Sequence, residues 1–256
     1  MKLALSVDDV RALMADPPYA GNELLELALQ FPHSPKLSDP ETIHYFVEYE
    51  RLLRPVRNAA VNLLEIGVFK GDSLRLWQAY LPASRISGID VDRHPDASGL
   101  RVFVGDQKDL GFLASVVEQA GLFDVIIDDG SHVMADQIAT LRYLFRHGLR
   151  PGGAYVIEDL GTSYWHAWGG GIDASDTTVA FLKRLVDAVN YRAHKGGRRG
   201  YRGASARIPC LDTLVLDEFD EQLVSMTFVR SMCVLCKGDN RSLDLEGGAP
   251  GSDRLE

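Results

Sequence analysis

The sequence lacks the marks of several protein classes. Its 256 residues include three cysteines, Cys210, Cys233 and Cys236, which are too few for a disulfide framework. No apolar run approaches the roughly 20 residues that cross a bilayer, and the apolar start of the chain is too short for a signal peptide. The formal net charge of -9 argues against general binding of nucleic acid. These absences predict a cytoplasmic protein with no nucleic-acid or membrane partner.

The first sixty residues carry helix signals and no strand pattern. Ser6 and Asn22 are suited to cap helices, because their side chains can accept bonds from the free N–H groups of a first turn. Asp39-Pro40-Glu41 predicts the start of a longer helix that runs to about Arg54. Three polar or aromatic side chains of this helix are expected to look into a site: His44, Tyr45 and Tyr49.

From Val61 onward, apolar runs and helical patterns alternate. Strands are expected at 61–67, 85–90, 101–104, 123–129 and 154–158, with helices at 73–80, 110–120 and 135–145, and a turn at Pro151-Gly152-Gly153. This alternation predicts a doubly wound α/β fold whose mainly parallel sheet is covered on both faces. Beyond it, a helix at 177–191 and an antiparallel hairpin of strands 224–229 and 232–236 are expected.

Two of the expected strands end in paired acids. Asp128-Asp129 is followed by Gly130, Ser131 and His132, and one βα unit later the next strand delivers Glu158-Asp159. Neighbouring parallel strands lie about 5 Å apart, so acids at their ends can share a divalent cation. Helix capping explains one such pair, but it does not easily explain two. Oxygen ligands favour Mg²⁺ or Mn²⁺.

This pattern predicts Asp129, Glu158 and Asp159 as metal ligands and His132 as a catalytic base. Histidine has an ordinary pKa near 6.5, so a neutral imidazole is available near neutral pH. The alternatives for His132 are that it caps the following helix or binds the metal itself.

A glycine-containing turn follows the first strand, in Glu65-Ile66-Gly67-Val68-Phe69-Lys70-Gly71. Glycines let the backbone approach a ligand closely, although turns also use them routinely. Asp90 ends the second strand, where a carboxylate can accept bonds from both hydroxyls of a ribose. The tighter Gly-x-Gly-x-x-Gly turn typical of phosphate-binding nucleotide sites is absent.

Together with Gly105-Asp106-Gln107 after the third strand, these residues resemble the cofactor motifs of class I S-adenosylmethionine-dependent methyltransferases. The resemblance implies a cofactor-binding domain at 61–238, preceded by a helical segment at 1–60 and followed by a disordered tail at 239–256. The residues implied for the cofactor are Gly67 and Gly71 at the methionine part, Asp90 at the ribose, Asp106 with Gln107 at the adenine, and Glu65, Ser73 and Asp128 around them.

A narrower resemblance rests on His44, Leu63 to Val68, Asp128 to His132, Pro151-Gly152-Gly153, and Glu158 to Leu160 with Thr162 to Tyr164. These stretches are similar to the metal-dependent sugar O-methyltransferases of macrolide (mycinamicin and tylosin) and rhamnosyl tetracenomycin biosynthesis. The resemblance implies methylation of a sugar hydroxyl on a small-molecule glycoside with S-adenosylmethionine and Mg²⁺ or Mn²⁺. Macrolide members carry an extra N-terminal domain that helps assemble the oligomer, and this chain is too short for it. A homo-oligomer and the identity of the acceptor therefore stay open.

Other interpretations remain. The alternatives are a catechol-type O-methyltransferase, a companion in antibiotic hydroxylation related to cephalosporin hydroxylase-like proteins, and a subunit that binds a cofactor without catalysis. Cys233-x-x-Cys236 resembles half a zinc site, although core cysteines explain it better because this spacing points the thiols to opposite faces of a strand. The basic stretch 192–207 is a lid, an anion contact or, more simply, a mobile solvated loop. Trp165 and Trp168 either stack on the acceptor or anchor their own loop.

Overall fold

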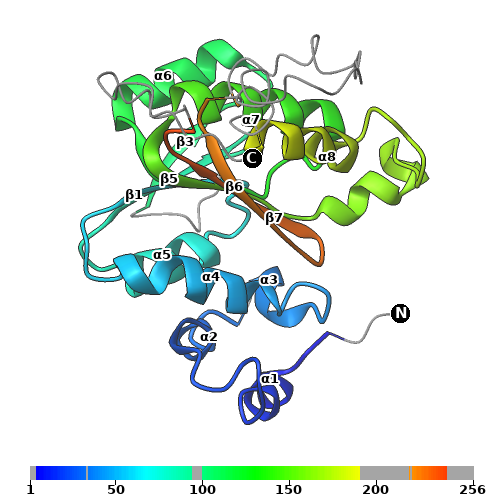
Figure 1. Cartoon of the computed structure of the whole chain (residues 1–256). Helices are drawn as coiled ribbons and strands as arrows, with labels where there is room; N and C mark the ends of the chain where they lie inside the picture. The colour runs from blue at the N-terminus through cyan, green and yellow to red at the C-terminus, as the bar shows by residue number, and fades with distance from the viewer. Residues whose placement is uncertain (1–3, 33, 94–99, 191–218, 220, 241–256) are drawn as a thin grey trace, which may run out of the picture.

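The computed structural model describes residues 4–32, 34–93, 100–190, 219 and 221–240 (Figure 1). The basic stretch at 192–207, Cys210 and residues 241–256 of the expected tail lie outside the described residues. No described helix is long and apolar enough to cross a membrane.

The N-terminal segment is helical, as its caps predict. The side chain of Ser6 accepts a bond from the Asp9 N–H, and the Asp9 carboxylate accepts one from the Ser6 N–H, which closes a capping box. The Asn22 side chain accepts a bond of 2.7 Å from the Leu25 N–H. The short helices of this segment are α1 (Val7–Leu13), α2 (Glu23–Ala28) and α3 (Pro35–Ser38).

The longer helix starts later than predicted. Instead of beginning at Pro40, α4 spans Tyr45–Leu53 and continues into the 3-10 turn η1 (Arg54–Val56). Asp39 does act as a cap, since its Oδ1 accepts a bond of 2.8 Å from the Glu41 N–H. The N–H groups of residues 45 to 47 then bond to carbonyls three residues back, so tight turns rather than an α-helix occupy residues 40–44.

A seven-stranded sheet forms the centre of the molecule, in the order β3-β2-β1-β4-β5-β7-β6. The first five strands are parallel, and β7 lies antiparallel to both β5 and β6. The strand order reverses between β1 and β4, and ligands bind at such a switch point in open α/β sheets. The strands are β1 (Asn62–Ile66), β2 (Arg85–Asp90), β3 (Arg101–Val104), β4 (Phe123–Asp128), β5 (Leu149–Ile157), β6 (Leu223–Val229) and β7 (Met232–Lys237). The predicted doubly wound, mainly parallel fold with a C-terminal hairpin is confirmed.

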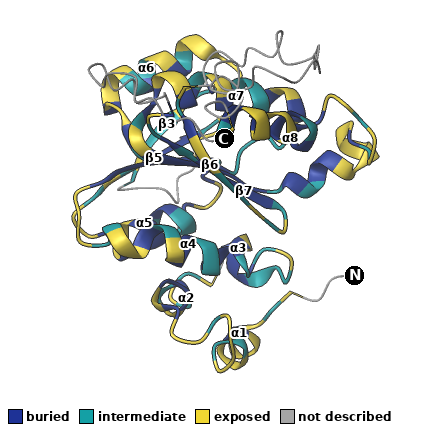
Figure 2. Ribbon diagram, in the orientation of Figure 1, coloured by how far each residue is buried: buried dark blue, intermediate teal, exposed yellow. Residues whose placement is uncertain are grey.

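Helices cover both faces of this sheet, as Figure 1 shows. The helices that follow the strands are α5 (Asp72–Tyr80), α6 (Leu110–Ala120), α7 (Met134–His147) and α8 (Thr178–Val189). One apolar cluster joins α5 and the N-terminal helices to one face, through Leu63, Ile127 and Val156, and a second joins α6, α7 and α8 to the other. In Figure 2, the residues coloured as buried lie along these two interfaces between helices and sheet. Residues 4–60 therefore share a core with the sheet.

The two described cysteines lie on opposite faces of β7. Cys233 is buried in the cluster of α6, α7 and α8, whereas Cys236 packs against the cluster of the N-terminal helices. Burial raises the pKa of the Cys233 thiol. The two thiols are therefore core side chains, as the spacing of three residues predicted.

The predicted turn at Pro151-Gly152-Gly153 is wrong, because these residues lie within β5. The register between β4 and β5 passes from Phe123 opposite Leu149 to Val125 opposite Ala154, so β5 bulges here. Gly152 takes a φ of +86° in this bulge. The strand resumes at Ala154, and the bulge leaves its far end in register with the end of β4.

Two buried polar side chains close the ends of helices. The Lys237 ammonium donates to the carbonyls of Phe145, Arg146 and Leu149 and so caps the end of α7. Asn240, within the expected tail, is buried and donates to the carbonyl of Ala188 at the end of α8. The folded part of the chain therefore reaches at least Asn240.

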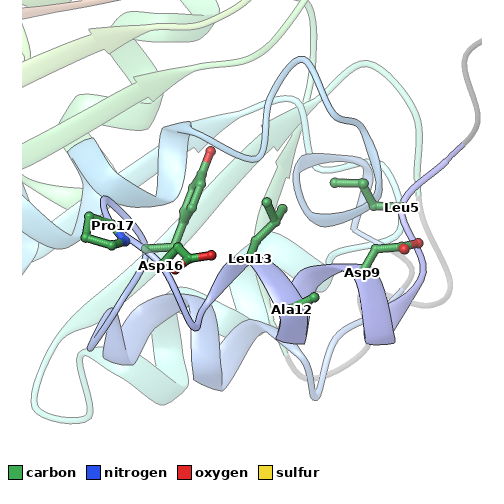
Figure 3. Close-up of a pocket in the computed structure, with 7 residues that line it drawn as sticks. Leu5, Asp9, Ala12, Leu13, Asp16 and Pro17 are labelled. Carbon is green, nitrogen blue, oxygen red and sulfur yellow. The ribbon is translucent and has the colours of Figure 1, made fainter.

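The N-terminal segment also carries a hollow of about 460 Å³, shown in Figure 3. Apolar side chains of Leu5, Leu13 and Tyr19 line it together with the acids Asp9 and Asp16. None of the residues implied for cofactor or metal lines this hollow.

Gly67 tests how tightly the first βα turn fits the end of β4. Its φ is +92°, and a Cβ at this position would overlap the Asp129 carbonyl oxygen. Gly21 is a matched control, because its φ is +72° and no atom lies within 4 Å of its ideal Cβ. Backbone strain should cost about 1–2 kcal/mol in both alanine variants, and overpacking should add about 1–3 kcal/mol in Gly67→Ala. Urea unfolding measures both, and equal losses would contradict the close contact.

Candidate active site

The paired acids meet at the carboxyl edge of the sheet. Ile66 of β1 is in register with Asp128 of β4, which is in register with Ile157 of β5. The residues that follow these three positions, Gly67, Asp129 and Glu158, therefore leave the sheet side by side. This is the switch point between β1 and β4, and it brings Asp129, Glu158 and Asp159 together, whereas Asp128 turns into the core.

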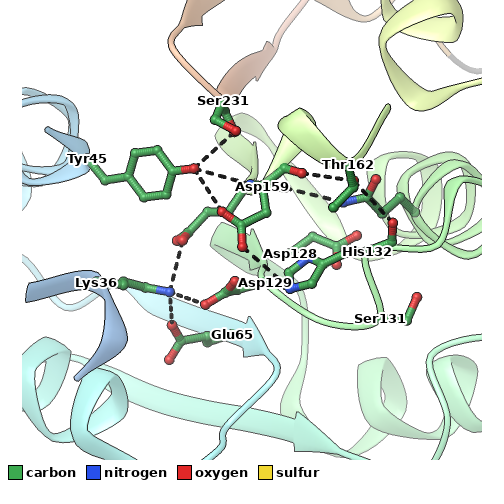
Figure 4. A network of polar contacts seen from close by, with 12 residues as sticks. Lys36, Tyr45, Glu65, Asp128, Asp129, Ser131, His132, Asp159, Thr162 and Ser231 are labelled. Carbon is green, nitrogen blue, oxygen red and sulfur yellow. Dashed lines mark hydrogen bonds and ion pairs between the residues drawn. The ribbon is translucent and has the colours of Figure 1, made fainter. Parts of the chain in front are cut away.

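A buried lysine lies at the centre of these acids, and sequence reasoning did not anticipate it (Figure 4). Lys36, in α3, forms an ion pair with Asp129 Oδ2, and its Nζ lies 3.0 Å from Glu158 Oε2 and 3.5 Å from Glu65 Oε1. The Tyr49 hydroxyl donates a hydrogen bond to the other Glu158 oxygen, Oε1. We call Lys36, Glu65, Asp129 and Glu158 the inner cluster.

Burial and mutual contact shift the ionisation of this cluster. Burial lowers the pKa of Lys36, but Asp129, Glu158 and Glu65 outweigh it and hold that pKa well above the ordinary value. Burial also raises the pKa of Glu158 well above its usual range, and Asp129 adds to this while Lys36 opposes it. The pKa of Glu65 is raised in the same way. The lysine is therefore held in its charged form.

A second group, more open to solvent, shares Asp129 with the inner cluster. His132 Nε2 lies 3.9 Å from Asp129 Oδ1 and 3.7 Å from Asp159 Oδ2. One ligand atom from each of these residues lies within 4.8 Å of the other two. The Tyr45 hydroxyl donates a bond of 3.0 Å to Asp159 Oδ1. We call Asp129, His132 and Asp159 the outer cluster.

The outer cluster fits a hard divalent cation, because two carboxylates and an imidazole converge on one half-buried point. The metal set predicted from the sequence is thus divided in this structure. Asp129 and Asp159 belong to the outer cluster, whereas Glu158 turns toward Lys36 and Tyr49. His132 stands where it can act as a base or as a ligand, so its role stays a prediction.

Left-handed backbone conformations concentrate around these clusters. The described non-glycine residues with positive φ are Phe69 (49°), His132 (56°), Asp159 (54°) and Ser231 (62°). Such conformations cost about 1–3 kcal/mol each and persist where the surrounding structure enforces them. At Ser231, the carbonyl accepts the Tyr45 hydroxyl and the Oγ accepts the Gly161 N–H. The strain thus falls on residues that hold the outer cluster and its surroundings.

A crevice of about 170 Å³ lies beside the acids, between the ends of β1, β2 and β4. It brings together five residues that the sequence implied for a cofactor or placed beside them: Gly67, Asp90, Asp106, Gln107 and Ser131. A smaller hollow of about 40 Å³ adjoins it at Gly67 and is lined by Ser34, Lys36, Phe69, Ser73 and Asp129. The two hollows share Gly67, and the smaller one reaches Lys36 and Asp129 of the inner cluster.

Several of the implied cofactor residues also hold the crevice in shape. Asp90 Oδ2 accepts bonds of 2.8 and 3.1 Å from the N–H groups of Val68 and Phe69 in the first βα turn. Gln107 accepts a bond of 2.7 Å from the Ser131 N–H and donates to Asp128 Oδ1. Because Gln107 is 4% exposed, its amide serves the wall of the crevice.

Asp128 and Glu65 extend from opposite faces of the sheet, and Ser73 lines the smaller hollow. Asp128 is fully buried and accepts a bond of 3.0 Å from the Tyr155 hydroxyl, and burial raises its pKa to about 6. Ser73 donates a bond of 2.7 Å to Glu65 Oε2, which joins α5 to the end of β1. Gly71, with a φ of +78°, opens α5. Asp128 therefore supports the wall of the crevice through Gln107, whereas Glu65 supports the smaller hollow through Ser73.

On the other side of the outer cluster lies a hollow of about 460 Å³. Asp159 of the outer cluster and Tyr45 line it on one side, and Tyr164, Trp165 and Phe228 provide aromatic walls. It lies against the 3-10 turn η3 (Leu160–Tyr164) and the tip of the β6–β7 hairpin, and the turn η4 (His166–Trp168) follows Trp165 along the chain.

Of the remaining aromatic residues expected near a site, some contact the two clusters and one does not. Trp168 meets the His132 ring edge-on, with the ring centroids 6.1 Å apart. Tyr45 and Tyr49 reach the acids, as expected, but His44 turns to the hairpin and contacts the Arg230 carbonyl.

The strand order, the antiparallel β7 and the crevice at the switch point define the class I methyltransferase fold. No family model matches the chain. This chain is similar to the solved structure of MycE, a methyltransferase from the mycinamycin pathway in complex with Mg, SAH and mycinamycin VI. The two structures superpose with a TM-score of 0.69 and 30% sequence identity, over 96% of this chain and 66% of the MycE chain.

Two curated relatives show which kind of methyltransferase the chain is similar to. Mycinamicin VI 2''-O-methyltransferase of Micromonospora griseorubida is 40% identical over 163 residues, which are 59% of this chain and 41% of that protein. Demethylmacrocin O-methyltransferase of Streptomyces fradiae is 34% identical over 226 residues, or 82% of this chain and 52% of that protein. The resemblance to sugar O-methyltransferases is therefore confirmed, and the chain spans about half the length of the curated relatives it matches.

Proposed function

We propose that the chain is an S-adenosylmethionine-dependent, divalent-metal-assisted O-methyltransferase that acts on a sugar hydroxyl of a glycosylated natural product. The observation that carries this proposal is the position of the outer cluster: Asp129 lines the small hollow that shares Gly67 with the crevice, and Asp159 lines the aromatic hollow. A methyl donor on the side of Asp129 and an acceptor on the side of Asp159 would meet at this cluster, which includes His132. The names of the relatives support the same chemistry.

The cofactor occupies the two adjoining hollows in this proposal. The adenosine lies in the crevice of Asp106, Gln107 and Ser131, with its ribose at Asp90, and the methionine part extends past Gly67 toward Ser73. The N–H groups of Val68 and Phe69 donate to Asp90 Oδ2 and that of Asp92 donates to Oδ1, so the carboxylate is held in place where it lines the crevice. The exposed Val91 adds apolar surface beside the adenine.

The protein's task in methyl transfer is alignment and proton removal. The sulfonium of S-adenosylmethionine is already a good leaving group, so the acceptor oxygen forms its bond to the methyl carbon as the carbon–sulfur bond breaks. His132 takes the hydroxyl proton at Nε2, the atom that faces Asp129 and Asp159. A divalent cation held by Asp129 and Asp159, with Glu158 recruited from the inner cluster, would make the bound hydroxyl more acidic.

The acceptor lies in the aromatic hollow. Its volume of about 460 Å³ falls within the range of small-molecule sites. Trp165 and Tyr164, which are 55% and 45% exposed, offer flat apolar faces of the kind that stack on sugar rings. Trp168 contacts His132 and would fix the orientation of the base.

Incubation of the chain with S-adenosylmethionine, Mg²⁺ and a panel of glycosides and catechols tests this function. Mass spectrometry should show one added methyl group on a glycoside, and EDTA should abolish the product until Mg²⁺ restores it. Methylation of catechols but of no glycoside would mean that the acceptor is a catechol rather than a sugar. Full turnover in EDTA would remove the metal from the mechanism.

The ribose contact is tested by Asp90→Ala. This change removes the charged acceptor of the ribose hydroxyls and leaves the N–H groups of Val68 and Phe69 without their partner. One lost charged bond costs about 1.5–3 kcal/mol, so S-adenosylhomocysteine should bind roughly tenfold more weakly, or worse. Calorimetry with Asp92→Ala as the control, an exposed acid two residues on, measures the effect. Unchanged affinity in folded Asp90→Ala would refute this placement.

The base is tested by His132→Ala, with His166→Ala as an exposed histidine control. If His132 takes the proton, kcat should fall by about 10²–10⁴-fold while Mg²⁺ and cofactor affinities stay nearly unchanged. The wild-type rate should also rise with pH through an ionisation that the variant lacks. Loss of Mg²⁺ binding in calorimetry would instead make His132 a ligand, which the distances to Asp129 and Asp159 permit.

A further inference from the structure

Lys36 is a buried lysine whose partners are carboxylates rather than backbone carbonyls. Its side chain is 6% exposed and meets three carboxylates, those of Glu65, Asp129 and Glu158. Lys237 is equally buried, but its ammonium donates to three backbone carbonyls at the end of α7. Lys237 therefore stabilises a helix end, whereas Lys36 neutralises acids that converge on the functional site.

The inner cluster places three carboxylates around a single ammonium. Glu65 and Glu158 are almost fully buried, and a buried charge is costly unless it is paired. A carboxylate that loses its ammonium partner here must bind a proton or find another cation. Without Lys36 the cluster would need positive charge from elsewhere.

Asp129 and Glu158 are at once partners of Lys36 and predicted ligands of a divalent cation. Asp129 directs Oδ2 to Lys36 and Oδ1 toward His132. Glu158 has no free oxygen, because Oε2 faces Lys36 and Oε1 accepts the Tyr49 hydroxyl. A cation that recruits Glu158 must therefore share these oxygens with the lysine or displace it.

We propose that Lys36 is a tethered internal cation that holds the inner cluster together and competes with the divalent cation for Asp129 and Glu158. The inference rests on the metal site of the proposed function. It deepens that function, because it assigns the control of metal affinity to Lys36, a positioning residue from the N-terminal segment. The lysine keeps Asp129 and Glu158 gathered when no metal is bound. Its charge and its occupancy of their oxygens weaken the binding of Mg²⁺.

Removal of the charge should therefore strengthen metal binding. In Lys36→Met, Mg²⁺ is the cation that can neutralise the inner cluster, and its affinity should rise at least about tenfold, equivalent to about 1.4 kcal/mol. The metal-free variant should melt below the wild type, and Mg²⁺ should raise its melting temperature by more than it raises that of the wild type. A lysine that merely orients the ligands would have the opposite effect on affinity.

Isothermal titration of the full chain with MgCl₂, alongside thermal unfolding with and without Mg²⁺, tests this proposal. Lys36→Gln is the second variant, because its amide can still donate to one carboxylate if the methionine variant does not fold. Lys36→Arg keeps the charge and should bind Mg²⁺ as weakly as the wild type. Lys237→Met is the matched control for loss of a buried lysine, and it should lower stability without changing Mg²⁺ affinity.

Equal or weaker Mg²⁺ binding in both uncharged variants would overturn the role of Lys36 while leaving the metal site intact. Tight binding in Lys36→Met with none in the wild type would support the competition but would count against a metal in the wild-type reaction. Absence of Mg²⁺ binding in every variant would overturn both this inference and the metal of the proposed function.

Discussion

The meeting of one ammonium with three carboxylates at the sheet edge is the constraint around which the site is arranged. Each acid arrives from a different strand, because β1, β4 and β5 end at the same edge. The neutralising groups come from the other direction: Lys36 and Tyr49 belong to the helices that precede the sheet. The apolar cluster that fastens those helices to the sheet therefore also sets the charge balance of the site. Packing and electrostatics are coupled at this point.

Most of the sheet could be predicted from the sequence, because apolar runs with acids or glycines at their ends mark parallel strands. Asp90, Asp129 and Glu158 reach one edge because the strands they follow or end are parallel, as the alternation of strands and helices predicts. The two errors arose where local signals compete. Asp39-Pro40 initiates turns as readily as a helix, and Pro151-Gly152-Gly153 has the composition of a turn but lies in a bulged strand whose register is fixed by β4.

The partners of the acids could not be predicted in the same way. Lys36 precedes Asp129 by 93 positions, and nothing near it in the sequence distinguishes it from a solvent-exposed lysine. The division of the predicted metal ligands between two clusters depends on side-chain directions at Glu158 and Asp159, which are adjacent in the chain. Strand periodicity does predict that adjacent residues point to opposite sides, but Asp159 has already left the strand with a φ of +54°.

The tip of the β6–β7 hairpin touches two distant parts of the chain at once. The Ser231 carbonyl accepts bonds from the Tyr45 hydroxyl and the Leu160 N–H, and the Arg230 carbonyl contacts His44. Hydrogen bonds thus join three segments around Asp159: the helix before the first strand, the loop after β5 and the last hairpin. The helices before residue 61 are consequently an inseparable part of the site. A chimera that exchanged them between related chains would transplant Lys36, Tyr45 and Tyr49 with them, and with these residues the charge balance around Asp129 and Glu158.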